Sequence, residues 1–186
     1  MADLVQALEG AFDYATAVVE GVRPEHLDAP TPCPEWDLRT LLQHMTGVVV
    51  DMGRGAAGEE LLADRDGYEL ADDVGAQFST EVDRTLAAWR ARGLDGQVDV
   101  GAGPMPAAAA ISVNLVDTST HAWDVAVASG QDATLPEDLA TTVLGVAEGF
   151  VGPELRQAVG IGPPVPVAGD APATDRLVAF MGRRPR

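Results

Sequence analysis

The chain has 186 residues, 46% of them hydrophobic, which is enough for one domain with a buried core. Its formal net charge at pH 7 is −17, and all twelve basic residues are arginine. Such an acidic surface repels phosphate backbones and anionic headgroups, so we expect no nucleic-acid or membrane partner. The single cysteine, Cys33, excludes an intramolecular disulfide and a zinc site built from several cysteines.

No targeting or spanning segment is visible. The first residues lack the basic and then apolar layout of a signal peptide, and no apolar run reaches the roughly 18 residues that a spanning helix needs. We therefore expect a cytoplasmic protein that is a monomer or a homodimer.

The first half of the chain alternates helical periodicity with breaks. Apolar residues at helical spacing predict a first helix over residues 2–22. The proline-rich stretch 29–36 cannot form regular structure, so it is expected to be a rigid connector. Asp37 is a suitable N-cap for a second helix over residues 38–51, and a glycine-rich loop over residues 53–67 follows.

The second half continues the helical pattern. The remaining predicted helices span residues 72–92, 107–129, 136–150 and 173–181, with a short helical turn ending near residue 159. Residues 97–100 are a candidate for a short extended segment. We predict an all-α fold in one domain, with a core bundle over residues 2–130 and a C-terminal helical extension over residues 131–186.

The helix over residues 107–129 carries the clearest functional signal. Its only ionisable side chains are Asp117, His121 and Asp124. Asp117 and His121 lie one turn apart, and Asp124 follows three residues later on the same face. Because the rest of the chain is rich in charged residues, we expect a helix with so few of them to be buried on most sides. Buried carboxylates and imidazoles must be paired or bound to metal.

A second histidine offers a partner. His44 lies within the apolar helix over residues 38–51, and His44, Asp117 and His121 converge if the two helices pack face to face. Two imidazoles and one carboxylate are the ligand set of a catalytic zinc or other divalent site with a free position. The alternative is that Asp117 and His121 form a surface pair on the solvent face of an amphipathic helix.

Three further residues are candidates for a role near this site. Metal-bound histidines usually donate their other ring N–H to a carboxylate, so we expect Asp124 to orient a ligand or line the pocket rather than bind the metal. Asp51 is either a fourth ligand or a solvated helix end. Cys33 is a candidate nucleophile without a base nearby in sequence, and a small core residue is the competing interpretation.

Several segments of the chain resemble a known family. They resemble DinB-like metal-binding proteins, and more narrowly the stand-alone branch related to the N-terminal domain of mycothiol-dependent maleylpyruvate isomerase. The matching segments are residues 31–36 (TPCPEW), 38–44 (LRTLLQH), 121–126 (HAWDVA) and the tail over residues 162–182. The resemblance covers nearly the whole chain.

The resemblance implies a four-helix bundle that holds a divalent metal, usually zinc. The family's ligand pattern falls on His44, Asp117 and His121. In the isomerase the acidic position is Glu, and the shorter Asp moves the site by about one methylene. The isomerase also has a separate C-terminal domain, whereas here only about 50 residues follow the helix that carries Asp117.

The implied function is that of a divalent-metal-binding protein with Zn²⁺ as the metal and mycothiol as cosubstrate. A thiol transferase or isomerase would use the metal to activate the thiolate. The alternative is a non-catalytic sensor or interaction protein that binds a metal or a small ligand. In either case the expected partner is a small-molecule thiol or another small ligand.

Overall fold

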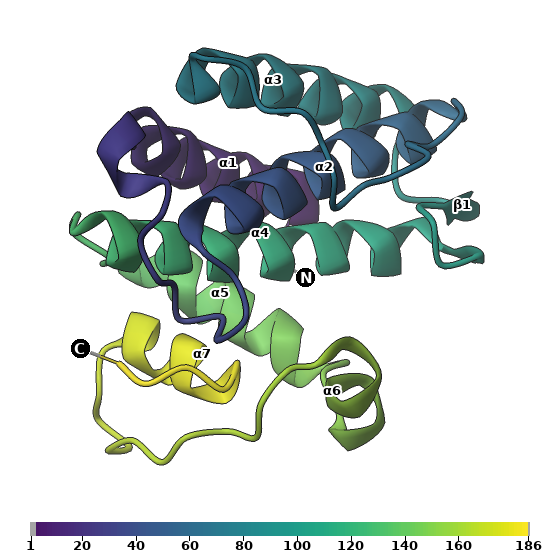
Figure 1. Ribbon diagram of the computed structural model, residues 1–186. Coiled ribbons are helices and arrows are strands. Elements are labelled where there is room, and N and C mark those ends of the chain that lie inside the picture. Colours follow the sequence, from purple (N-terminus) through teal and green to yellow (C-terminus); the bar gives the residue numbers. More distant parts are fainter. Residues whose placement is uncertain (1–2, 186) are drawn as a thin grey trace.

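The computed structural model describes residues 3–185, and helices dominate it (Figure 1). The four longest helices are α1 (Leu4–Glu20), α2 (Leu38–Ala57), α3 (Val74–Arg92) and α4 (Ala107–Ser129). Helices α1 and α2 each pack against both α3 and α4, which makes a four-helix bundle. The prediction of an all-α fold is confirmed.

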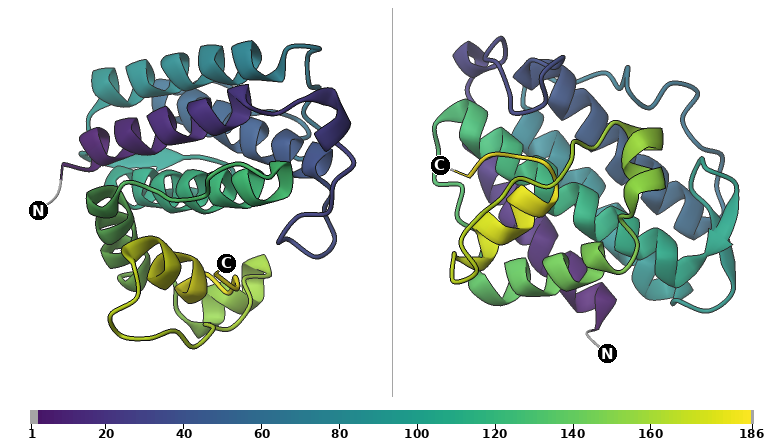
Figure 2. Two further views of the ribbon diagram at one scale, coloured as in Figure 1. Left: turned by 90° about the vertical axis from the view of Figure 1, so that its left-hand side faces the viewer. Right: turned by 90° about the horizontal axis from the view of Figure 1, so that it is seen from below.

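The C-terminal segment packs against the side of α4 that faces away from α1 and α2. It contains α5 (Glu137–Glu148), α6 (Pro153–Val159) and α7 (Ala173–Phe180), and both α5 and α7 contact α4 (Figure 2). With α1 and α2 on one side and α5 and α7 on the other, α4 is buried along most of its length. This two-sided burial explains why α4 has almost no charged side chains.

Helix α2 is longer than predicted. It continues from residue 51 to Ala57 through Gly53 and Gly55, which the sequence pattern assigned to a loop. A side chain at Gly53 would collide with Thr85 of α3, and one at Gly55 would collide with the carbonyl of Asp99. The two glycines therefore let neighbouring segments approach the helix closely, rather than ending it.

A short hairpin joins α3 to α4. Strand β1 (Gln97–Asp99) pairs antiparallel with β2 (Pro104–Pro106), and Val98 lies opposite Met105. The extended segment expected over residues 97–100 is therefore present, and its partner strand was not predicted. Within residues 3–185, no helix is long and apolar enough to cross a membrane.

The connector between α1 and α2 folds back over the start of α2. It contains a 3₁₀ turn, η1 (Pro24–His26). Further along, the Thr31 hydroxyl lies 3.1 Å from the carbonyl oxygen of Cys33 and 2.8 Å from that of Trp36. Asp37 caps α2 by accepting the backbone N–H of Thr40 at 2.8 Å. These bonds hold Cys33 and Trp36 beside α4.

Candidate metal centre

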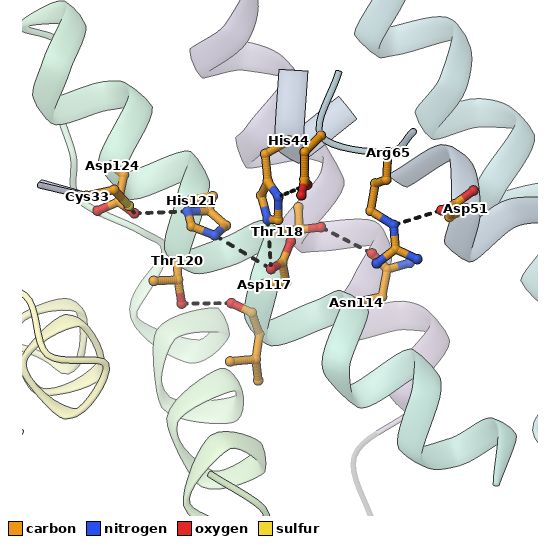
Figure 3. A network of polar contacts seen from close by, with 12 residues as sticks. Cys33, His44, Asp51, Arg65, Asn114, Asp117, Thr118, Thr120, His121 and Asp124 are labelled. Atoms are coloured by element: carbon orange, nitrogen blue, oxygen red, sulfur yellow. Dashed lines mark hydrogen bonds and ion pairs between the residues drawn. The ribbon is translucent and has the colours of Figure 1, made fainter. Parts of the chain in front are cut away.

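The structure brings the three predicted ligands together between α2 and α4. His44 Nε2 lies 3.9 Å from Asp117 Oδ1, and His121 Nε2 lies 3.6 Å from the same oxygen (Figure 3). The two imidazole ring centres are 5.2 Å apart. One ligand atom from each residue can be chosen so that all three lie within 4.8 Å of one another. This is the convergence that the helical spacing predicted, and it favours the buried site over the surface pair.

Both imidazoles are oriented by a carboxylate on the outer nitrogen. His44 Nδ1 lies 2.7 Å from Asp66 Oδ1, and His121 Nδ1 lies 3.0 Å from Asp124 Oδ2. An ionised carboxylate can only accept a hydrogen bond, so each Nδ1 carries the proton and donates it. The Nε2 lone pairs of both rings are then free on the side of Asp117, as in metal-bound histidines.

Asp117 has an oxygen that a cation would satisfy. Asp117 Oδ2 is buried and has no hydrogen-bond partner within residues 3–185. Burial raises the pKa of Asp117, but the nearby His121 and His44 lower it by more, so this carboxyl is ionised at neutral pH. An ionised carboxylate with one buried, unbonded oxygen between two imidazoles fits the donor set of a divalent metal.

The hydroxyl groups next to Asp117 in the sequence are hydrogen-bonded within α4 itself. Ser119 and Thr120 donate to backbone carbonyls one turn earlier, at 2.8 and 2.7 Å, and Thr118 donates to the Asn114 side chain at 3.2 Å. Their hydroxyls therefore do not compete for the Asp117 carboxylate.

The centre is reachable from solvent on one side. The side chains of His44 and Asp117 are 19% and 22% exposed, and that of His121 is 11% exposed. The Trp36 ring lies against both imidazoles, with its centre 4.7 Å from that of His44 and 6.0 Å from that of His121. Trp36 therefore forms a wall of the site as well as packing at the start of α2.

Asp124 lies behind His121, away from Asp117. Its side chain is fully buried, and Arg183 Nη2 contacts Oδ2 at 2.8 Å while Arg183 Nε contacts Oδ1 at 3.3 Å. Cys33 Sγ also lies 3.4 Å from Asp124 Oδ2. Asp124 thus lies where it can orient His121, and the role of orienting a metal ligand stays a prediction.

Cys33 is not an activated nucleophile. Burial, together with the neighbouring Asp124 carboxylate, raises the pKa of the Cys33 thiol to about 12. The thiol is therefore protonated at neutral pH, and only thiolates attack efficiently.

Asp51 is neither a fourth ligand nor a solvated helix end, so both expectations for it were wrong. It is 2% exposed and accepts hydrogen bonds from the Leu62 backbone and from Arg65 Nε, both at 2.7 Å. Arg65 also donates to the carbonyl of Val100 at 2.6 Å. These bonds anchor the loop between α2 and α3, which carries Asp66 against His44.

Asp66, Trp36 and Arg183 surround the converging residues, and local sequence patterns did not predict these positions. Asp66 lies in a loop with several other acidic residues, and nothing in its local sequence distinguishes it. Arg183 is 59 positions from Asp124, too far for any periodic pattern to connect them. Trp36 lies in the proline-rich connector over residues 29–36, whose rigidity was predicted but whose path over the start of α2 was not.

The charges around His44 make the stability of the metal-free protein depend on pH. Burial lowers the pKa of His44, but Asp117 and Asp66 raise it by more, so it lies above its ordinary value of 6.5. The resulting stabilisation is complete below pH 6.5 and is lost as the pH rises through the raised pKa. We expect its loss to cost at most about 1.4 kcal/mol per pH unit in this range.

Urea unfolding with a chelator present, at about pH 6 and about pH 8, measures this effect. His44→Gln is expected to remove the part of the pH dependence that His44 supplies. Identical pH dependence in wild type and variant would contradict the assignment.

Comparison with known proteins connects this geometry to one family. Residues 8–126 match the family described as mycothiol maleylpyruvate isomerase N-terminal domain. A crystal structure of the mycothiol-dependent maleylpyruvate isomerase aligns with a TM-score of 0.58 at 18% identity, covering 76% of this chain and 66% of that chain. A mutant of that isomerase aligns to the same extent. At this identity the alignments show a shared fold, and they span just under two thirds of the isomerase.

Similarity over the full length is found with two proteins from two strains of Mycobacterium tuberculosis, named uncharacterized proteins Rv0738 and MT0763. Each is 34% identical over 189 residues, which covers 99% of this chain and 100% of the relative. The three converging residues and Asp124 all fall within the matched residues 8–126. The chain belongs to the family of the mycothiol maleylpyruvate isomerase N-terminal domain.

Proposed function

We propose that this protein binds a divalent metal ion, zinc, through His44, Asp117 and His121. The observation that carries the proposal is the convergence of two Nε2 atoms on a carboxylate whose second oxygen is buried and unbonded within residues 3–185. Imidazole nitrogens and a carboxylate oxygen suit zinc, and three protein ligands leave one position of a tetrahedral ion open. The partial exposure of the ligands gives a small molecule access to that position.

We further propose that the open position receives a small-molecule thiol, and that this thiol is mycothiol. Family membership and the mycothiol dependence of the structurally similar isomerase support the choice. A bound zinc ion supplies the positive charge that stabilises a thiolate at neutral pH. Two neutral imidazoles and one carboxylate offset only half of a 2+ charge, so an anionic fourth ligand is favoured.

The chain's own residues prepare the site for such a ligand. Asp66 and Asp124 hold the two imidazoles with Nε2 on the side of Asp117, and Trp36 limits the space beside both rings. Cys33 cannot supply the thiolate, because its proton is held by burial and by Asp124. The nucleophile must then come from a bound thiol, which fits a thiol-dependent transferase or isomerase.

The metal content of protein purified without a chelator or an affinity tag tests the first step. We expect about one zinc ion per chain, since His44, Asp117 and His121 together can hold one ion. Protein that stays metal-free when refolded or dialysed with equimolar zinc would contradict the metal proposal.

Calorimetric titration of the zinc-loaded protein tests the second step. We expect binding heat with mycothiol and none with mycothiol methylated at sulfur, because only the free thiol yields a thiolate. Equal heats for both compounds would show that sulfur does not reach the metal. Zinc binding with no mycothiol heat at millimolar thiol would favour a non-catalytic metal-binding protein.

A further inference from the structure

The segment after α7 sends one arginine into the interior, against the metal-centre helix. The Arg183 side chain is 11% exposed and the Asp124 side chain is fully buried. The guanidinium contacts both oxygens of this carboxylate, at 2.8 and 3.3 Å, and a third nitrogen donates to the carbonyl of Met181 at 2.8 Å. A forked contact of this kind fixes both the position and the plane of a carboxylate.

We propose that Arg183 is a positioning residue for the metal centre, which acts through Asp124 on His121. The proposal rests on the proposed function of His121 as a ligand. With both oxygens held, the Asp124 carboxylate presents Oδ2 to His121 Nδ1 at 3.0 Å, and His121 Nε2 is left for the metal. Arg183 lies outside the matched residues 8–126, so this contact to the metal-centre helix comes from the C-terminal segment and not from the matched region.

A second group of potential metal ligands beside Asp124 gives a reason for the arginine at position 183. Cys33, His121 and Asp124 also place one ligand atom each within 4.8 Å of one another, which is a group that could hold a metal ion. Arg183 Nη2 lies 2.8 Å from Asp124 Oδ2 and 3.4 Å from Cys33 Sγ. The guanidinium therefore already supplies the positive charge that this group needs. It keeps His121 Nδ1 a donor, and Nε2 becomes the metal-facing nitrogen.

The test compares Arg183→Met with Arg184→Met in zinc affinity. Arg184 is the next residue and is exposed, so its variant controls for the loss of one arginine at the same place in the chain. Loss of an outer partner of a metal-bound histidine typically weakens metal binding 10- to 100-fold. We expect a rise of about that size in the zinc Kd for Arg183→Met, no change for Arg184→Met, and partial recovery in Arg183→Lys.

A double-variant cycle separates positioning from general destabilisation. If Arg183 acts through Asp124, its replacement has little further effect in an Asp124→Asn background. An undiminished effect in that background would overturn the proposal, as would equal zinc Kd values for Arg183→Met and Arg184→Met.

The absorption spectrum of Co²⁺-loaded protein gives a signal that would not change if Arg183 only stabilised the fold. In Co²⁺-loaded Arg183→Met we expect a sulfur-to-cobalt charge-transfer band, because the group containing Cys33 becomes available, and the band disappears in a Cys33→Ser background. Absence of the band together with an unchanged cobalt spectrum would count against the proposal.

Nitrogen NMR of the histidine rings in metal-free protein tests the same idea without any metal. Wild type is expected to show the proton of His121 on Nδ1, and Arg183→Met a mixture of the two tautomers. Unchanged His121 signals in the variant would overturn the role of Arg183. This NMR measurement tests the role of Arg183 even if the wild-type protein binds no zinc. A failure to bind zinc would contradict the proposed function only.

Discussion

Replacing His121 with alanine is expected to abolish zinc retention while leaving the helix content largely intact. His121 supplies one of three converging ligand atoms, and the remaining pair, His44 and Asp117, lies on two different helices. Zinc in a four-ligand site is bound by about 10–16 kcal/mol, or roughly 3 kcal/mol per ligand. The variant should therefore bind zinc on the order of 100-fold more weakly. Competition with a chromogenic chelator measures this loss, and far-ultraviolet circular dichroism follows the helices.

His26→Ala is the matched control, since His26 lies in the 3₁₀ turn and bonds to Arg23 rather than to the centre. It should keep the zinc affinity of wild type. If His121→Ala and His26→Ala bind zinc equally well, His121 is not a ligand. If His121→Ala loses its helices, the experiment must be repeated with His121→Gln, which keeps more of the side-chain volume.

Gly47→Ala is expected to lower the free energy of unfolding by about 1–3 kcal/mol, although alanine is the better helix former. Gly47 lies in α2, one turn after His44, and an added methyl group would overlap the carbonyl oxygen of Arg65. Backbone cannot yield as a flexible side chain can, so the loop must move away from the helix. That movement also loosens Asp66 from His44. Urea unfolding gives the stability change, and the rate of trypsin cleavage after Arg65 reports the loop movement.

Gly145→Ala in α5 is the matched control. A side chain there meets nothing within 4 Å, and the position is exposed. It should gain about 0.5–1 kcal/mol from the reduced freedom of the unfolded chain. A Gly47→Ala protein as stable as Gly145→Ala, with wild-type resistance to trypsin, would show that the loop does not lie against α2 in solution.

Local periodicity was sufficient to predict the helices of the bundle, and it predicted the convergence of the polar residues on the condition that α2 and α4 pack face to face. The stripe of Asp117 and His121 on α4, and His44 on an apolar α2, required only helical spacing and the cost of burying unpaired charge. The low charge of α4 correctly indicated burial on most sides. That these residues hold zinc stays a prediction.

What the sequence could not reveal depends on contacts between distant segments. The extension of α2 through Gly53 and Gly55 depends on the close approach of Thr85 and Asp99 from elsewhere in the chain. Glycine alone is ambiguous, because it serves a loop and a tight helix contact equally well. Asp66 and Arg183 likewise owe their positions to tertiary packing and not to any local preference.

The contact between Cys33 and Arg183 spans 150 positions, whereas the three converging residues all lie between positions 44 and 121. A ribosome adds about 5–20 residues per second, so roughly 3–12 seconds separate the synthesis of His121 from that of Arg183. During translation, Asp124 therefore gains its guanidinium partner only seconds after the three converging residues have been made.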